Sequence, residues 1–285
     1  MMGKPAAMSR VDFIPYPPTA FPFRDLLVLE RLEFSDTDRV CEIGVGSGGT
    51  TARLAKKCRE VVGFEISAPT VQALHYLEER HPNLRFVVAD VTEPAALAPY
   101  AGRFTKLIAC DTLEHVRDPA AFFRAAAVLL ERGGELLVTF PNEPKERMHG
   151  ITRFDAPAEL EALVRAAGFA ESQLGAANLS GTSKPVADAL GFRPIVLARK
   201  VLRRKAKNGK KNGGSGTDVA APPQTFDETH FFKNMDTWRR LSPALNAYWF
   251  GVLRLMEARG PAFDVDWNFA RTPFTDCQVL VVARK

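Results

Sequence analysis

The feature that most constrains the fold of this chain is a regular alternation of short β-rich runs and helical stretches between residues 39 and 174. Runs of about four to eight residues rich in Val, Ile and Phe are typical of buried strands. Because helices separate the strands, the strands can pair in parallel, which predicts a doubly wound, Rossmann-like α/β sheet with helices on both faces. The predicted strands are 39–44, 60–66, 84–89, 104–110, 135–140 and 169–174, and the predicted helices are 50–57, 69–80, 119–130 and 157–167.

The alternation does not continue after the sixth strand, and only one further strand is predicted, the run CQVLVVA at 277–283. We expect this run to be buried and to complete the sheet as an edge-region partner of the sixth strand. The chain is then expected to consist of an N-terminal cover segment (1–38), a core (39–176 and 270–285) and a largely helical insertion before the last strand (177–269).

A strand, a glycine-rich loop and a helix follow one another in the run VCEIGVGSGGTT. Glycines allow the tight turn and the close approach of a ligand that such a loop requires. Gly44, Gly46 and Gly49 form GxGxxG, the dinucleotide fingerprint, which would make the chain an NAD(P)-dependent oxidoreductase. Gly44, Gly46 and Gly48 form GxGxG after the acidic Glu42. The glycines alone do not separate these two interpretations.

Acidic residues near the ends of the predicted strands discriminate between the two ligands. Open α/β sheets bind ligands at the carboxyl ends of their strands, and four successive strands carry an acid there: Glu42, Glu65, Asp90 and Asp111. A dinucleotide pyrophosphate disfavours nearby carboxylates, whereas S-adenosylmethionine carries an ammonium, a sulfonium, a ribose diol and an adenine amine. Glu65 is placed to accept from the ribose hydroxyls and Asp90 from the adenine amine. The acids therefore favour S-adenosylmethionine.

Five motifs resemble, in order and spacing, those of class I S-adenosylmethionine-dependent methyltransferases: VCEIGVGSGGTT, VVGFEIS, VVADV, LIACDTLEHVRDP and GGELLVTFPN. The EHVxDP string at Glu114–Pro119 is most similar to small-molecule O-methyltransferases such as those of the ubiquinone pathway. The resemblance implies a seven-stranded sheet whose last strand is antiparallel. It also implies the cofactor contacts: Glu42, Gly44, Gly46 and Gly48 at the methionine part, Glu65 and Ile66 at the ribose, Asp90 and Val91 at the adenine, and Asp111 and Thr112 beside the methyl group.

Methyl transfer to oxygen needs a base beside the methyl position, and two histidines are candidates. A His of near-neutral pKa is a common general base; His115 follows the fourth strand and His149 the fifth. Asp111, Glu114 and His115 also form DxxEH, which could bind Mg²⁺ or Zn²⁺. The ubiquinone-pathway enzymes have a similar ExxEH with a metal role. The alternative is that no metal binds: one acid of the DxxEH string caps a helix, and the other two residues support it.

These motifs predict methylation of oxygen on a small, partly hydrophobic acceptor such as a quinone, polyketide, sugar or lipid precursor. N- or C-methylation of a small molecule is the alternative within the same chemistry. The aromatic residues of the insertion predict a lid that excludes water from the acceptor. The alternative is that the same aromatic residues pack in the core of an additional helical layer and form no lid.

The net charge of +5 comes from one segment. Eight of the 38 basic residues lie between Arg199 and Lys211, in an expected flexible loop at 199–223, and the rest of the chain has more acidic than basic residues. The segment 191–211 is either solvated or a basic amphipathic helix that contacts an anionic membrane or lipid. An RNA methyltransferase that uses this segment is less favoured, because no aromatic residues interleave with the charges.

Features that the sequence lacks bear on where the protein is located and on how its cysteines are used. The first residues contain no apolar run of signal-peptide length, and no uninterrupted apolar run reaches membrane-spanning length. The four cysteines are widely spaced without CxxC pairs, so we expect neither a zinc site nor a disulfide framework from them. We therefore expect a cytoplasmic protein. Peripheral contact with the inner face of a membrane is expected only if the segment 191–211 binds anionic lipid.

Overall fold

The computed structural model describes residues 23–46, 48–194, 247–249 and 251–285. The expected basic loop, most of the insertion and most of the N-terminal cover segment lie outside the described residues. Within the described ranges no helix is long and apolar enough to cross a membrane. The described residues thus comprise the core and both ends of the insertion.

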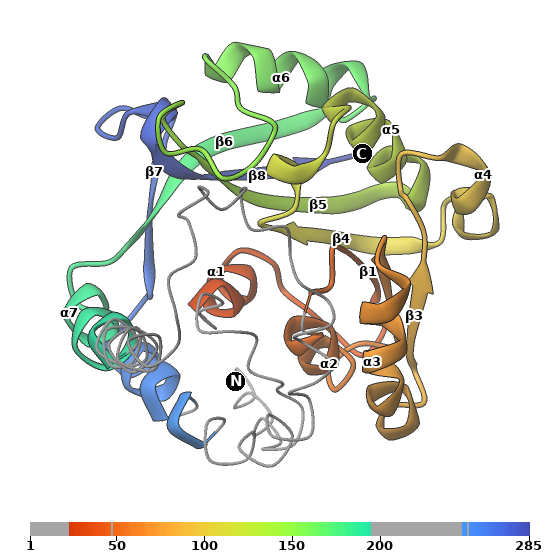
Figure 1. Ribbon diagram of the computed structural model, residues 1–285, viewed down its shortest axis with the longest axis horizontal. Helices are drawn as coiled ribbons and strands as arrows, with labels where there is room; N and C mark the ends of the chain where they lie inside the picture. The colour runs from red at the N-terminus through yellow and green to blue at the C-terminus, as the bar shows by residue number, and fades with distance from the viewer. Residues whose placement is uncertain (1–22, 47, 195–246, 250) are drawn as a thin grey trace, which may run out of the picture.

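An eight-stranded sheet forms the centre of the molecule (Figure 1). The strands are β1 (Arg39–Ile43), β2 (Glu60–Glu65), β3 (Leu84–Val88), β4 (Phe104–Cys110), β5 (Leu130–Asn142), β6 (Glu171–Leu179), β7 (Phe263–Trp267) and β8 (Cys277–Arg284). Their order in the sheet is β3-β2-β1-β4-β5-β8-β6-β7. β1 to β5 pair in parallel, whereas β8 is antiparallel to both of its neighbours. The doubly wound α/β sheet with an antiparallel last strand is therefore confirmed.

Two details of the sheet differ from expectation. The sheet has eight strands instead of seven, because β7 pairs antiparallel with the outer side of β6. The sequence of β7, FDVDW, is short and contains two aspartates, so it gave little strand signal. β8 pairs with β6 as expected but also with β5, so it lies inside the sheet and the outer edge belongs to β7.

Helices cover both faces of the sheet and enclose two hydrophobic cores (Figure 1). α1 (Phe23–Arg31), α2 (Gly49–Leu54) and α3 (Ala68–Arg80) lie on one face, and α4 (Pro94–Leu97), α5 (Pro119–Leu129) and α6 (Pro157–Ala166) lie on the other. The shorter elements are η1 (Ala98–Tyr100), η2 (Leu113–His115), α7 (Lys184–Val186), η3 (Ala187–Phe192) and η4 (Phe274–Asp276). Leu27, Leu54 and Leu74 belong to the first core. Phe122 and Leu160 belong to the second.

Local sequence signals account for two helix starts. Ser67 accepts a hydrogen bond from Thr70 N at 3.3 Å and caps α3, and Asp118 accepts one from Ala121 N at 2.9 Å and caps α5. Both helices have a proline in the first turn, where the missing N–H is not needed. Only Ile66 and Ser67 separate β2 from α3, so the cap of α3 lies directly after Glu65 in the chain.

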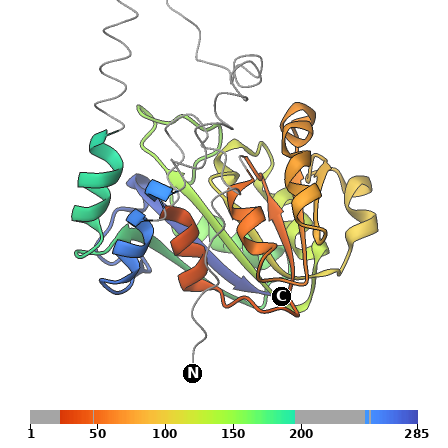
Figure 2. The same ribbon diagram turned by 90° about the horizontal axis from the view of Figure 1, so that it is seen from below.

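The C-terminal end of the insertion packs on the core. Residues 247–257 are helical, with residue 250 outside the described set. Figures 1 and 2 both place this helix beside α7. Its residues Trp249, Val252 and Met256 are buried in the core beneath α1 to α3. Core packing therefore accounts for Trp249, one of the aromatics expected in a lid.

Candidate active site

The glycine loop follows β1 and leads directly into α2. Gly44, Gly46 and Gly48 have left-handed backbones, with φ of 76°, 51° and 71°. A Cβ at Gly44 would lie 2.2 Å from Thr112 Oγ1, so the loop passes closely against the end of β4. A Cβ at Gly46 would meet nothing within 4 Å, which leaves this backbone open to a ligand. Gly49 has no positive φ and begins the helix, so the GxGxG pattern describes the loop better than GxGxxG.

Glu42 lies under the loop, with only 3% of its surface exposed. Its Oε2 accepts a hydrogen bond from Thr51 Oγ1 at 2.5 Å, which joins β1 to the first turn of α2. A buried, hydrogen-bonded carboxylate fixes the loop and places negative charge beside it. This charge suits a cationic ligand and not a pyrophosphate.

Glu65 ends β2 beside the same loop. Its Oε2 accepts from Gly46 N at 3.4 Å, and its Oε1 accepts from Ser67 N at 3.1 Å. Each carboxylate oxygen can accept a second hydrogen bond, so Glu65 can still accept from a vicinal diol. The next residue, Ile66, is 68% exposed despite being apolar. It offers an apolar surface next to the diol position.

Asp90 and Val91 follow β3 and differ in what they can offer a ligand. Asp90 is exposed, and its Oδ1 accepts from Thr92 N at 2.9 Å and from Thr92 Oγ1 at 2.6 Å. This turn orients the carboxylate and leaves Oδ2 for a further donor. Val91 is only 7% exposed and packs in the core beneath α4 to α6. The side chain of Val91 is therefore not available to a ligand, and only its backbone can contact an adenine.

Asp111 follows β4 with a left-handed backbone, φ 51°. Asp tolerates this conformation better than most residues, and such residues cluster at functional sites. Asp111 N donates to Thr139 O at 2.8 Å, and its Oδ1 accepts from Gln278 Nε2 of β8 at 2.7 Å. The neighbouring Thr112 Oγ1 donates to Ile43 O at 3.2 Å. The end of β4 is thus held between the glycine loop and β8.

The loop after β5 packs on the turn η2 and brings the two candidate bases together. Thr152 N donates to the Glu114 carbonyl oxygen at 2.9 Å. A Cβ at Gly150 would lie 2.6 Å from that oxygen, so a glycine is required for this close approach. As a result the rings of His115 and His149 have centroids 6.0 Å apart. The two histidines predicted separately share one site.

The surroundings of the two histidines differ. His149 Nδ1 lies 2.5 Å from Glu143 Oε2, and His149 N donates to the same oxygen at 3.1 Å, so Glu143 orients this ring. Burial lowers the pKa of His115, the neighbouring His149 lowers it further, and Asp111 partly opposes them. The lowered pKa keeps His115 neutral, and able to accept a proton, at neutral pH.

A buried carboxylate adjoins the histidine pair. Glu114 is 2% exposed, and its Oε1 lies 3.8 Å from His115 Nε2. Among the described residues, Glu114, His115 and His149 offer ligand atoms that all lie within 4.8 Å of one another. Two imidazole nitrogens and one carboxylate oxygen suit Zn²⁺ better than Mg²⁺. Asp111, expected from the DxxEH string, is outside this cluster, and its carboxylate accepts from Gln278.

Residues not expected from the sequence also hold the site together, and Asn142 is the most connected of them. It is fully buried at the end of β5. Its Nδ2 donates to Phe154 O at 3.0 Å and to Phe274 O at 2.8 Å, and its Oδ1 accepts from Phe154 N at 3.1 Å. These bonds close the loop that carries His149. The only sequence signal was a polar residue at the end of an apolar strand.

The geometry at the carboxyl ends of the strands fits S-adenosylmethionine. Gly46 exposes its backbone, Glu42 and Glu65 supply negative charge for a cation, and Ile66 offers an apolar surface beside an acceptor of ribose hydroxyls. A left-handed glycine loop after β1 and an acid at the end of β2 define the class of protein: a Rossmann-like fold with a cofactor site of the methyltransferase type.

The chain belongs to the methyltransferase domain family, a family of class I S-adenosylmethionine-dependent methyltransferases, whose sequence profile matches residues 21–172. It is 34% identical over 98 residues to the ubiquinone biosynthesis O-methyltransferase of Albidiferax ferrireducens, covering 34% of this chain and 38% of the relative. It is 32% identical over 169 residues to that of Xanthomonas euvesicatoria pv. vesicatoria, covering 52% and 69%. The chain thus spans from 38% to 69% of the length of these two curated relatives.

Among solved structures, the [4+2]-cyclase SpnF has a TM-score of 0.51 and 17% sequence identity, covering 95% of this chain and 84% of that chain. At this identity the likeness shows the fold alone. Because that protein is a cyclase, the fold does not determine the reaction, and the chemistry has to be argued from the site.

Proposed function

We propose that this protein transfers the methyl group of S-adenosylmethionine to an oxygen atom of a small, partly apolar acceptor. The observation that carries the proposal is the position of the histidine pair next to the cofactor loop. His115 N donates to Thr112 O at 2.9 Å, and Thr112 Oγ1 donates to Ile43 O at 3.2 Å. Two consecutive hydrogen bonds therefore tie the proposed base to the end of β1.

S-adenosylmethionine, when bound, supplies a methyl group that its positive sulfur has already activated for displacement. The chain then has to align the acceptor oxygen with that methyl group and remove a proton. In our proposal Glu42, Glu65 and Asp90 orient the cofactor. The neutral imidazole of His115 accepts the proton of the acceptor hydroxyl. His149, oriented by Glu143, forms the opposite side of the acceptor site.

The residues around His149 support an acceptor that is partly apolar. Met148 and Ile151 lie beside it in the same loop and are 38% and 58% exposed. Exposed apolar side chains that adjoin a polar site are typical of ligand-binding surfaces. Both curated relatives are named as O-methyltransferases of ubiquinone biosynthesis, which supports a quinone precursor over a sugar or a polyketide.

Binding and transfer can be tested separately. S-adenosylhomocysteine should raise the unfolding temperature of the full chain, and NADH should not. A shift with NADH alone would overturn the cofactor assignment in favour of an oxidoreductase. With a labelled methyl donor, phenolic and catechol acceptors should take the label in preference to amines and sugars. Label on nitrogen or carbon alone would leave a methyltransferase but overturn O-methylation.

A divalent cation held by Glu114, His115 and His149 is a second candidate role for the same cluster, because its three ligand atoms lie within 4.8 Å of one another. A His115 bound to an ion cannot accept a proton, so the two roles exclude each other. A bound ion would lower the pKa of an acceptor hydroxyl. If His115 is the base, treatment with EDTA leaves turnover unchanged. Loss of turnover that Zn²⁺ or Mg²⁺ restores would favour the metal instead.

Contact with an anionic membrane through residues 191–211 is a separate proposal, and most of that segment lies outside the described residues. It rests on the basic residues between Arg199 and Lys211. Co-sedimentation with vesicles that contain phosphatidylglycerol should decrease when residues 199–211 are deleted. Equal co-sedimentation of the two forms would contradict it.

A further inference from the structure

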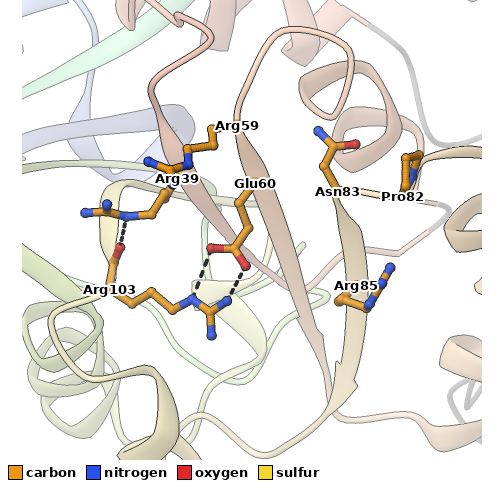
Figure 3. A pocket seen from close by; sticks show the side chains of 7 residues that line it. All are labelled: Arg39, Arg59, Glu60, Pro82, Asn83, Arg85 and Arg103. Atoms are coloured by element: carbon orange, nitrogen blue, oxygen red, sulfur yellow. Dashed lines mark hydrogen bonds and ion pairs between the residues drawn. The ribbon is translucent and has the colours of Figure 1, made fainter.

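A cavity of about 560 Å³ lies at the edge of the sheet opposite the candidate active site. We call it the arginine pocket. Its lining residues lie at or next to the first residues of β1 to β4 and are Arg39, Arg59, Glu60, Pro82, Asn83, Arg85 and Arg103 (Figure 3). Four of these seven residues are arginines, and one is an acid. Like charges gathered around one cavity repel each other unless an anion is present.

Carboxylates neutralise two of the arginines. Arg103 Nε donates to Glu60 Oε2 at 3.0 Å, and its Nη2 donates to Glu60 Oε1, as Figure 3 shows. Arg39 Nη2 donates to Glu131 Oε2 at 2.5 Å, and its Nε donates to the Arg103 carbonyl oxygen at 2.5 Å. These bonds hold Arg39 and Arg103 in place as part of the pocket wall.

The other two arginines have no carboxylate partner within the part of the chain that the structure describes. Arg59 makes no side-chain hydrogen bond or ion pair there, and Arg85 Nη1 donates only to the preceding backbone carbonyl, at 2.6 Å. Both are exposed to the cavity side of the surface. Asp38, next to the pocket in sequence, already accepts from Ser35 and Thr105. Two positive charges are therefore available to a ligand.

We propose that the arginine pocket binds the phosphate group of a small phosphomonoester, with Arg59 and Arg85 as its ion-pair partners. Guanidinium groups match phosphate oxygens in a two-pronged geometry. A phosphate dianion carries two negative charges for the two free arginines, whereas a carboxylate carries one. Figure 3 draws the two guanidinium groups on opposite sides of the start of β2, so both exposed side chains have to turn into the cavity for one phosphate to bind them. The cavity volume lies within the range of about 300–1,000 Å³ that is usual for small-molecule sites, so it has room for the organic part.

The arginine pocket and the candidate active site lie at opposite ends of the same strands. β1 has five residues and β2 has six, which at about 3.3 Å per residue separates the two edges by about 15–20 Å. The phosphomonoester is therefore neither the methyl acceptor nor a competitor of the cofactor. Its binding can be measured whether or not the proposed methyl transfer is correct.

The test is a titration of the full chain by calorimetry, with glycerol 3-phosphate and inorganic phosphate as probes. Sodium chloride of equal ionic strength serves as the blank. We expect saturable binding of glycerol 3-phosphate that is unchanged by saturating S-adenosylhomocysteine. Vesicles of phosphatidylcholine with and without phosphatidic acid form a second arm. Binding to phosphatidic acid without binding of glycerol 3-phosphate would mean that the ligand is a lipid headgroup. That result would overturn the assignment of a small phosphomonoester.

Variants of the lining residues should change the affinity in opposite directions. The double variant Arg59→Gln/Arg85→Gln should lose at least about tenfold in affinity, since each charge-assisted hydrogen bond is worth about 1.5 kcal/mol or more. Glu60→Gln should bind phosphate more tightly, because it removes the only acid of the lining. The matched control is Arg124→Gln, an exposed arginine on α5 that is 3.7 Å from Asp118. Equal affinity of the double variant and the wild type, or an equal loss in the control, would overturn the site.

Discussion

The two edges of the sheet carry opposite charges although they are the two ends of the same strands. The carboxyl ends of β1 to β4 present Glu42, Glu65, Asp90 and Asp111, and the amino ends present Arg39, Arg59, Arg85 and Arg103. In β2 the contrast lies within six residues, because Glu60 begins the strand and Glu65 ends it. Glu60 pairs with Arg103, whereas Glu65 accepts from backbone N–H groups of the glycine loop. The same residue type thus acquires two roles from its neighbours.

The edges also differ in how their side chains are held. The carboxyl edge depends on special backbone positions, such as left-handed Gly46 and Asp111 and the close contact of Gly150. The amino edge depends on long charged side chains that pair at the surface, such as Arg103 with Glu60. Backbone geometry therefore positions the side chains of the carboxyl edge, and ion pairs position those of the amino edge.

The largest expected effect is a loss of turnover, without a loss of cofactor affinity, when the proposed base at the carboxyl edge is removed. His115→Ala should lower kcat by about 10²- to 10⁴-fold, because a general base contributes that much. The affinity for S-adenosylhomocysteine should stay within about twofold, since His115 is not among the proposed cofactor contacts. Single-turnover kinetics and calorimetry measure the two quantities. His75→Ala, an exposed histidine on α3 paired with Glu78, is the control and should change neither. Undiminished turnover of His115→Ala would remove the base assignment.

The next effect compares the two ends of β2 directly. Glu65→Ala should weaken binding of S-adenosylhomocysteine by about 100-fold, because two hydrogen bonds to a charged acceptor are lost at about 1.5 kcal/mol each. Glu60→Ala, the same change at the other end of the strand, should weaken it by less than about twofold. Calorimetric titration of both variants gives the ratio. A similar loss in both would mean that general destabilisation, and not ribose binding, explains Glu65.

A smaller effect is expected on the free energy of unfolding, which should depend more on a residue at the carboxyl edge than on one at the amino edge. Asn142→Ala should lower the free energy of unfolding by about 2–3 kcal/mol, because it leaves buried backbone groups without their partners. Arg103→Gln should lower it by less than about 1 kcal/mol, because exposed ion pairs contribute little. Urea unfolding of the two variants measures both values. Equal losses would contradict the difference between a buried anchor and a surface pair.

The smallest effect concerns pH. Burial, and after it His149, lowers the pKa of His115 below the ordinary 6.5. The base is therefore neutral above that pH, and kcat/KM should fall only as the pH drops through a midpoint below 6.5. His149→Ala removes the neighbouring imidazole that lowers the pKa of His115 but leaves His115 buried. The midpoint of the pH profile should therefore rise and still stay below 6.5. A wild-type midpoint above 6.5 would mean that a negative charge dominates at His115.

The first half of the fold was predictable because its signals are local. Apolar runs mark β1 to β5, and Ser67 and Asp118 with their following prolines mark the starts of α3 and α5. Parallel strands bring their carboxyl ends to one edge, so the spacing predicts that the acids at these ends share that edge of the sheet. The approach of His115 to His149 needed the structure, because it depends on how one loop packs on another.

The remaining features depend on contacts that are distant in sequence. Gln278 reaches Asp111 across 167 residues, and Asn142 reaches Phe274 across 132. β7 is a strand only because β6 offers it an edge. The arginine pocket was not expected, because an arginine at the start of a strand has the same sequence pattern whether it is solvated or lines a cavity.

The position of β8 has a consequence for the newly synthesised chain. β6 pairs with β7 and β8; β7 lies near the end of the insertion, and β8 follows it. While the ribosome is making the insertion, β1 to β5 can assemble, but the outer side of β5 has no neighbour. An unpaired apolar edge is where nascent chains associate wrongly or engage chaperones. This side of β5 therefore stays uncovered at least until residues 177–269 and β8 itself have been translated.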